Sequence, residues 1–183
     1  MALSYYITDR WQLASLAGAE RLEPVGMDLL RRKVRSAFQA GVDYVQVREK
    51  DLEARPLAAL VEDLAGMAEK RGSRLLVNGR ADVALASKAD GVHLPADSLP
   101  AAAVRSLVGR DQSVGVSCHS PQEVEQAAAA EVDYVLLGPV FETPSKPGAT
   151  PLGLAGRLYL VVAHRRFAYG LSSKLDNVHY SRH

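Results

Sequence analysis

The sequence has little of several features that define other classes of protein. Among its 183 residues there is one cysteine, Cys118, which excludes an intramolecular disulfide and is too little for a Cys-rich zinc site. A reducing, cytoplasmic location is therefore expected. No apolar run reaches the roughly 18–20 residues of a membrane-spanning helix, and residues 1–10 lack the basic stretch and apolar core of a secretory signal.

An excess of charge of one sign is also missing. The 22 basic and 21 acidic residues give a formal net charge of +1, which argues against nucleic acid or an anionic membrane surface as a partner. No Gly-x-Gly-x-x-Gly or Walker pattern supports a nucleotide-binding fold, and the five histidines show no metal-ligand spacing. We expect no metal site in the chain.

What is present is an alternation of short apolar runs with amphipathic stretches, which is typical of an α/β fold. Strands are predicted at residues 5–8, 44–47, 75–77, 92–94, 114–117 and 135–137. Helices are predicted at residues 28–40, 56–70, 81–89, 100–108 and 121–130, with a turn at 9–10.

A weak internal repeat supports this pattern. Three segments share a helix end, an aspartate and a strand start, and their aspartates, Asp43, Asp90 and Asp133, are 47 and 43 residues apart. Each interval holds one further strand, so the repeating unit is two strand–helix steps. This favours a TIM-type (β/α)8 barrel, with a doubly wound open sheet as the alternative.

Polar side chains collect where the predicted strands end, which is where parallel α/β folds carry function. The strand period of two places Gln46, Arg48 and Lys50 on one side. Two cations beside an amide are suited to bind a phosphate or a carboxylate. The alternative is a solvated charge run over residues 48–51.

The fifth strand ends with Ser117 and His119 on one side and Cys118 on the other. A histidine in this place can move protons near neutral pH. Ser120 and Glu123 also match a helix N-cap with a capping box, and the two interpretations are compatible. We interpret Cys118 as a buried small apolar residue rather than a catalytic thiol.

A loop over residues 143–148 is rich in proline, glycine and hydroxyl groups and contains Thr143 and Lys146. Such a loop can wrap an anion and close over a substrate, or it can be a surface connection. Composition and spacing alone thus indicate an anion-binding α/β enzyme.

Six segments, in order, resemble the superfamily of thiamine phosphate synthases and TenI-like proteins, which are TIM barrels. The resemblance covers about residues 5–154. The matching segments are Tyr6-Ile7-Thr8-Asp9, Val45-Gln46-Val47-Arg48-Glu49-Lys50-Asp51, Val77-Asn78-Gly79-Arg80, Asp90-Gly91-Val92-His93-Leu94, Gly115-Val116-Ser117-Cys118-His119-Ser120 and Leu137-Gly138-Pro139-Val140-Phe141.

The superfamily has two arms, and the chain differs from one of them. The synthases couple a pyrimidine pyrophosphate to a thiazole phosphate with magnesium, which two aspartates hold. Here Gly79 and Ser98 stand at those positions, and Asp97 lies one step away, on the opposite side if the segment is extended. The tautomerase arm, which needs no metal, resembles this chain in Asn78-Gly79-Arg80 and in Val140-Phe141-Glu142-Thr143.

The resemblance therefore implies a thiazole tautomerase that moves a proton on a carboxythiazole phosphate without a cofactor. His119 would act as base and then as acid. The substrate-binding residues implied are Gln46, Arg48, Lys50, Asn78, Ser117, Thr143 and Lys146. One alternative is a thiamine phosphate synthase, with magnesium as its cofactor. Another, of a different class, is an inactive anion-binding or regulatory protein.

The resemblance stops near residue 154, after which 29 residues remain. We therefore predict a barrel portion over residues 1–154 and an atypical tail over residues 155–183. The tail is too short for two further barrel units, so we expect a barrel truncated after its sixth strand. A truncation, a shifted reading frame and a genuine variant end are open alternatives. The exposed strand edges of an open barrel favour association into a homo-oligomer.

Overall fold

The structure, a computed structural model, describes residues 4–20, 22–68, 72–138 and 160–161. Its single sheet has the strand order β1-β2-β3-β4-β5-β6-β7, with parallel pairing from β1 to β6 and an antiparallel β7. The strands are β1 Tyr5–Ile7, β2 Tyr44–Val47, β3 Arg74–Asn78, β4 Gly91–Leu94, β5 Ser113–Cys118, β6 Tyr134–Leu137 and β7 Leu160–Val161. Because the order of the six parallel strands never reverses, the TIM-type arrangement is confirmed and the doubly wound alternative is wrong.

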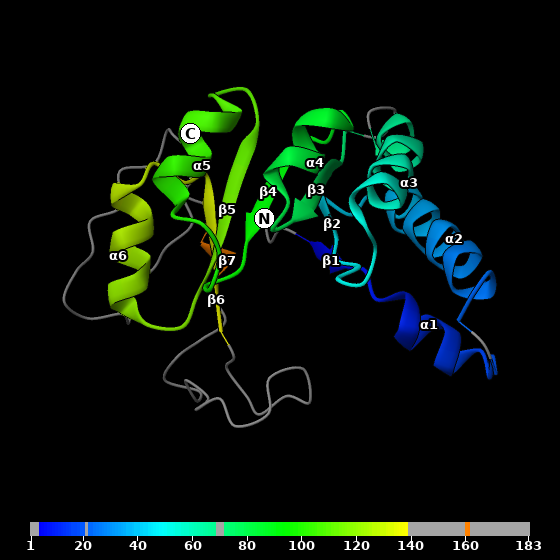
Figure 1. Cartoon of the computed structure of the whole chain (residues 1–183). Coiled ribbons are helices and arrows are strands. Elements are labelled where there is room, and N and C mark those ends of the chain that lie inside the picture. Colours follow the sequence, from blue (N-terminus) through cyan, green and yellow to red (C-terminus); the bar gives the residue numbers. More distant parts are fainter. Residues whose placement is uncertain (1–3, 21, 69–71, 139–159, 162–183) are drawn as a thin grey trace.

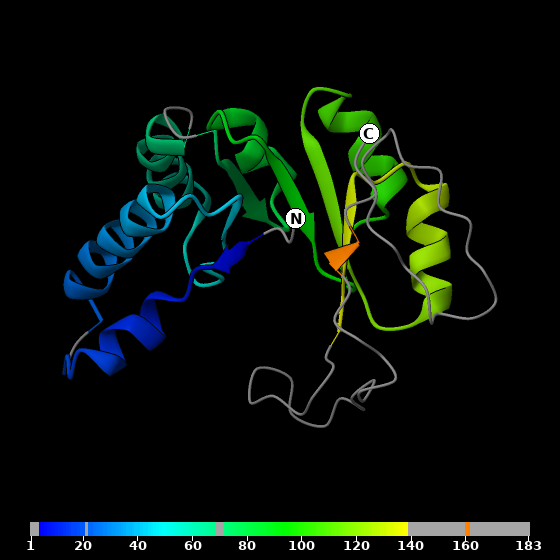
Figure 2. The same ribbon diagram turned by 180° about the vertical axis from the view of Figure 1, so that it is seen from behind.

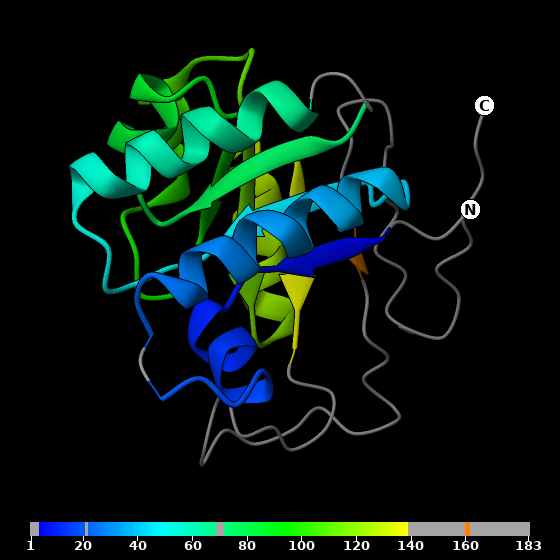
Figure 3. The same cartoon turned by 90° about the vertical axis from the view of Figure 1, so that its right-hand side faces the viewer.

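The helices between the strands lie along the outer side of the curved sheet (Figures 1 and 2). Seen from the side, α2 and α3 run next to the first three strands (Figure 3). The helices are α1 Arg10–Leu16, α2 Val25–Gln39, α3 Ala54–Ala68, α4 Ala81–Ala86, α5 Ala101–Val108 and α6 Pro121–Ala129. None of the helices described is long and apolar enough to cross a membrane.

The period of two along each strand separates an apolar outer face from a polar inner face. Outward side chains, packed against the helices, form the hydrophobic core; they include Val45, Val47, Leu75, Val77, Val92, Leu94, Val114 and Cys118. The alternate residues include Tyr44, Gln46, Asn78, His93 and Ser117. At one inner position a side chain is forbidden, because a Cβ on Gly115 would collide with the ring of Tyr134.

The three repeated aspartates have a common structural task. Each accepts a hydrogen bond from a backbone N–H at the start of the preceding strand: Asp43 from Ser4, Asp90 from Leu75 and Asp133 from Val114, each at 2.7 Å. These bonds join strands in pairs at the amino ends of the sheet. The repeat of two strand–helix steps thus reflects one carboxylate for every pair of strands.

The first helix differs from the sequence-based expectation. A turn was predicted at residues 9–10, but α1 begins at Arg10. Asp9 is its N-cap, since the Asp9 carboxylate accepts the Gln12 N–H at 2.9 Å. The prediction failed because a seven-residue helix is too short to show a periodic apolar pattern.

The loop at residues 143–148 lies outside the described residues, and so does the chain after 138 except for β7. The division into residues 1–154 and 155–183 therefore stays a prediction. Within the expected tail, Leu160–Val161 pairs with β6 in antiparallel orientation.

The aspartate bonds can be tested at Asp90, because Leu75 is fully buried and its N–H would lose its partner. Asp90→Ala should lower the free energy of unfolding by about 1–3 kcal/mol, whereas Asp90→Asn, which keeps an acceptor oxygen, should cost less. Urea denaturation measures both. The exposed Asp111→Ala is the control, with an expected change within about 0.5 kcal/mol. Equal stability of Asp90→Ala and wild type would contradict the assigned role.

Candidate active site

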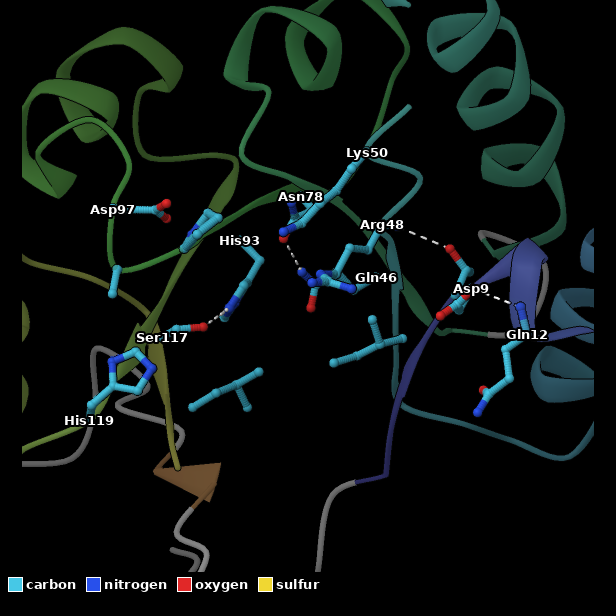
Figure 4. A pocket seen from close by; sticks show the side chains of 15 residues that line it. Asp9, Gln12, Gln46, Arg48, Lys50, Asn78, His93, Asp97, Ser117 and His119 are labelled. Atoms are coloured by element: carbon cyan, nitrogen blue, oxygen red, sulfur yellow. Dashed lines mark hydrogen bonds between the residues drawn. The ribbon is translucent and has the colours of Figure 1, made fainter. Parts of the chain in front are cut away.

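A pocket of about 590 Å³ opens at the carboxyl ends of the parallel strands (Figure 4). Every strand from β1 to β6, or the loop after it, contributes to its wall. The residues that line it are Ile7, Thr8, Asp9, Gln12, Gln46, Arg48, Lys50, Asn78, His93, Pro95, Ala96, Asp97, Ser117, His119 and Leu136. Six side chains singled out from the sequence meet here: Gln46, Arg48, Lys50, Asn78, Ser117 and His119. Thr143 and Lys146 lie outside the described residues.

Two cations and two amides form one wall of the pocket. Gln46 is 2% exposed, and its Nε2 donates to Asn78 Oδ1 at 2.7 Å. Arg48 and Lys50 follow on the same side of the chain and reach into the same space (Figure 4). This wall can therefore offer charge and N–H donors together, the combination that binds phosphate groups.

The residue between these two cations points the other way and is buried. Glu49 forms an ion pair with the buried Arg10 at 3.0 Å, and Arg10 also binds Asp51 at 2.6 Å and Glu23 at 3.1 Å. The Arg10 guanidinium holds the pKa of Asp51 below its ordinary value. The solvated charge run considered as an alternative is thus wrong at Glu49, whose negative charge is matched by Arg10 rather than by the pocket cations.

Thr8 connects this ion pair to the pocket wall. Its Oγ1 donates to Glu49 Oε1 at 2.6 Å and accepts the backbone N–H of Arg48 at 3.0 Å. Thr8 itself is fully buried. A hydroxyl held in this way fixes the backbone from which the Arg48 side chain extends.

His119 lies at the opposite side of the pocket, just before α6 (Figure 4). Ser120 caps this helix and accepts the Glu123 N–H at 3.2 Å, as expected from the sequence. The Glu123 carboxylate accepts the backbone N–H of His119 at 2.7 Å and lies 3.3 Å from its ring Nδ1. Burial alone would raise the pKa of Glu123, but these hydrogen bonds outweigh it and the pKa lies below its ordinary value. The carboxylate thus orients the imidazole.

The neighbouring cysteine does not take part in this arrangement. Cys118 is 1% exposed and packs in the core on the outer face of the sheet. Burial raises the pKa of its thiol to about 11. A thiol that stays protonated at neutral pH is a poor nucleophile, which agrees with the interpretation of Cys118 as an apolar core residue.

Sequence reasoning missed several residues of the site. His93 had no assigned role, although its alternation with the outward Val92 and Leu94 places it on the inner face. Asp97 was expected on the opposite side only if its segment is extended. The segment is not extended, because a turn is closed by the Ser98 N–H and the Pro95 C=O at 3.1 Å, and Asp97 lines the pocket. A tight turn breaks the period of two on which the prediction depended.

The curved parallel sheet and the cationic pocket at its carboxyl edge define an α/β-barrel type of protein, in which the loops after the strands form the site. The family-level sequence pattern described as thiamine monophosphate synthase (TMP-TENI) matches residues 23–164. The chain belongs to the thiamine monophosphate synthase family.

Individual relatives agree with this assignment. A thiamine-phosphate synthase of Solidesulfovibrio magneticus is 38% identical over 158 residues, which cover 86% of this chain and 69% of the relative. One of Acidothermus cellulolyticus is 45% identical over 116 residues, covering 63% of this chain and 55% of the relative. The solved structure of a thiamine phosphate pyrophosphorylase from Pyrococcus furiosus matches with a TM-score of 0.69 and 28% identity, covering 84% of this chain and 66% of that one.

The chain spans only part of most of these relatives. A relative from Geobacter sulfurreducens is 44% identical over 151 residues, and this match covers 65% of its length. A relative from Gloeobacter violaceus named thiamine-phosphate synthase is 43% identical over 121 residues, 36% of its length.

The resemblance to synthases implies magnesium, which is bound in proteins by carboxylates and other oxygen ligands. The described residues contain no group of three His, Cys, Asp or Glu side chains placed to hold a metal ion. At the two expected aspartate positions, Gly79 has no side chain and the Ser98 hydroxyl donates to the Leu99 carbonyl at 3.3 Å. Asp97 is the carboxylate that remains on this side of the pocket. These residues do not fit a magnesium site built from paired carboxylates.

The link from Thr8 to Arg48 predicts an effect on anion binding. Thr8→Val keeps the shape of the side chain but removes both hydrogen bonds, and should raise the dissociation constant for inorganic pyrophosphate about three- to tenfold, the effect of one net hydrogen bond. Thr8→Ser keeps both bonds and serves as the matched control. Isothermal titration calorimetry measures the constants, and identical binding by the Val variant and wild type would rule out the link.

Proposed function

We propose that the pocket of this chain is the active site of a thiamine-phosphate synthase. Such an enzyme joins a hydroxymethylpyrimidine pyrophosphate to a thiazole phosphate and releases pyrophosphate. The observation that carries this proposal is the wall of Arg48 and Lys50 beside the paired amides of Gln46 and Asn78. The names of the relatives support the synthase over the tautomerase expected from the sequence.

The proposed reaction is a substitution at the methylene carbon of the pyrimidine substrate. The thiazole ring nitrogen forms a bond to this carbon, and the carbon–oxygen bond to pyrophosphate breaks. Pyrophosphate leaves with the electron pair of that bond, and the thiazole nitrogen becomes positively charged. No proton has to move in the bond-forming step.

Negative charge grows on the departing pyrophosphate, and we assign its stabilisation to the two cations of the pocket wall. Arg48 and Lys50 would stabilise this charge in the transition state, while Gln46 and Asn78 would orient a heteroaromatic ring by hydrogen bonds. Ile7 and Leu136 provide apolar surface in the same pocket. The described residues can thus bind, orient and stabilise a leaving group, which is what such a substitution requires.

Release of pyrophosphate from the two substrates together is the test of this proposal. We expect release to need both substrates and to fall about 10²–10³-fold in Arg48→Gln, the scale of losing one electrostatic contact in a transition state. The exposed Arg110→Gln, a similar change outside the pocket, should keep wild-type activity. The assay is run with magnesium and again with a chelator. Absence of coupled product under both conditions would refute the synthase proposal.

A second candidate, the thiazole tautomerase, is favoured by two observations at the site. Gly79, at a φ of +68°, stands where the synthase pattern has an aspartate. His119 lines the pocket with its Nδ1 held near Glu123, so that Nε2 is the ring atom suited to take a proton from a carboxythiazole phosphate and return it elsewhere on the molecule. The cations would hold the anionic substrate, as in the first proposal.

His119→Asn separates the two candidates. For the tautomerase we expect turnover of a carboxythiazole phosphate to fall about 10²–10⁴-fold, the usual scale for an acid–base group, with an unchanged urea midpoint. Ultraviolet absorbance of the aromatic product reports the reaction. The coupling reaction needs no proton shuttle and should respond much less. Full tautomerase turnover without His119 would remove its proposed role.

A further inference from the structure

A continuous chain of hydrogen bonds crosses the inner face of the sheet and has both ends at the pocket. It joins side chains from all six parallel strands, although they are far apart in the sequence. In order, its members are Asn78, Gln46, Tyr5, Tyr134, His93 and Ser117. Figure 4 shows the two ends, with Gln46 bonded to Asn78 and His93 bonded to Ser117.

The direction of the first bonds is set by the amide of Gln46. Its Nε2 donates to Asn78 Oδ1 at 2.7 Å, so its Oε1 is the acceptor for the Tyr5 hydroxyl at 3.0 Å. Gln46 is buried, and both of its polar atoms thus have partners within the chain of bonds. The single hydroxyl proton of Tyr5 is committed to Gln46.

The remaining directions follow from a count of protons. Burial raises the pKa of Tyr5 and of Tyr134 above the ordinary value of 10, so each phenol carries one proton at neutral pH. Because Tyr5 has donated its own, Tyr134 must donate in the 3.1 Å contact between the two hydroxyls. The Tyr134 oxygen can then only accept in its 2.9 Å contact with His93 Nδ1. The proton in that contact belongs to Nδ1.

We propose that this chain of bonds holds His93 as its Nδ1–H tautomer and that His93 in turn positions the hydroxyl of Ser117. Burial at 2% exposure favours the neutral ring, in which Nε2 is an acceptor when Nδ1 carries the proton. Ser117 Oγ, 2.9 Å away, then donates its proton to Nε2. The lone pairs of Ser117 face the pocket.

The two residues at the ends of this chain of hydrogen bonds thus offer a ligand opposite groups, a donor at Asn78 and an acceptor at Ser117. Asn78 has used its oxygen on Gln46 and has N–H groups left to donate, whereas Ser117 has used its proton and accepts. The pocket selects a ligand with an acceptor toward Asn78 and an N–H or O–H donor toward Ser117. Tyr134 and His93 are positioning residues in this selection.

The tautomer can be observed directly by NMR on protein labelled with ¹⁵N histidine. We expect one histidine with a protonated Nδ1 and an unprotonated Nε2, and its signals should vanish in His93→Gln. A protonated Nε2 with a bare Nδ1 would mean that Tyr134 donates to His93 and that Ser117 accepts from it, and would overturn the proposal. A ring with both nitrogens protonated would overturn it as well.

Two tyrosine variants test whether the chain of bonds sets the tautomer. Tyr5→Phe frees the Tyr134 hydroxyl to donate to Nδ1, so a substantial Nε2–H population should appear at His93. Tyr44→Phe is the matched control, because the Tyr44 ring packs against both tyrosines, with ring centroids 5.9 Å from Tyr5 and 5.7 Å from Tyr134, without belonging to the chain of bonds. An unchanged tautomer in both variants would show that Tyr5 does not set it and would overturn the proposal.

The inference concerns the pocket of the proposed function, but its test needs no turnover. If the expected tautomer is found and no coupled product forms, the proposed synthase reaction fails and the inference stands. If coupling is active while His93 carries its proton on Nε2, the inference fails and the function stands.

Discussion

The hydrogen bond between the hydroxyls of Tyr5 and Tyr134 is the interaction on which the inner face of the sheet depends. These residues lie 129 positions apart in the sequence, and their oxygens are 3.1 Å apart. Tyr5 also bonds to Gln46 and Tyr134 also bonds to His93, but the bond between the two hydroxyls forms only when the first and the sixth strand are both in place. The contact thereby couples the curvature of the sheet to the polar groups at its pocket.

The glycine at position 115 is a direct consequence of this arrangement. The ring of Tyr134 occupies the space in which any Cβ on residue 115 would stand. The tyrosine can therefore reach inward to Tyr5 and His93 only where the neighbouring strand has no side chain. The lack of a side chain on β5 thus makes room for the ring on β6 whose hydroxyl forms these hydrogen bonds.

The two faces of the sheet are held by different interactions. On the outer face, apolar side chains pack against helices and the burial of hydrocarbon provides the stability. On the inner face, polar groups are held by partners that lead to the pocket. The buried charge of Glu49 also has a partner. It is paired with Arg10 and therefore does not cancel the charge of Arg48. The pocket wall therefore keeps the positive charges of Arg48 and Lys50.

Much of this could be predicted from local pattern alone. Alternating residues such as Gln46 and Arg48, or Ser117 and His119, were placed on one side by the geometry of a strand, and the parallel sheet brings their ends together. Periodicity could not identify α1, which is too short, or the position of Asp97, which depends on a turn.

The order of elements, the outward and inward residues of the strands, and the family were determined by the sequence itself, because each depends on neighbours along the chain or on ordered motifs. Only the tertiary structure decided which polar groups become partners. His93 gains its importance from Tyr134, 41 residues away, and from Ser117, 24 residues away. The direction of a hydrogen bond between such residues depends on every other proton in the same network, and no local pattern contains that information.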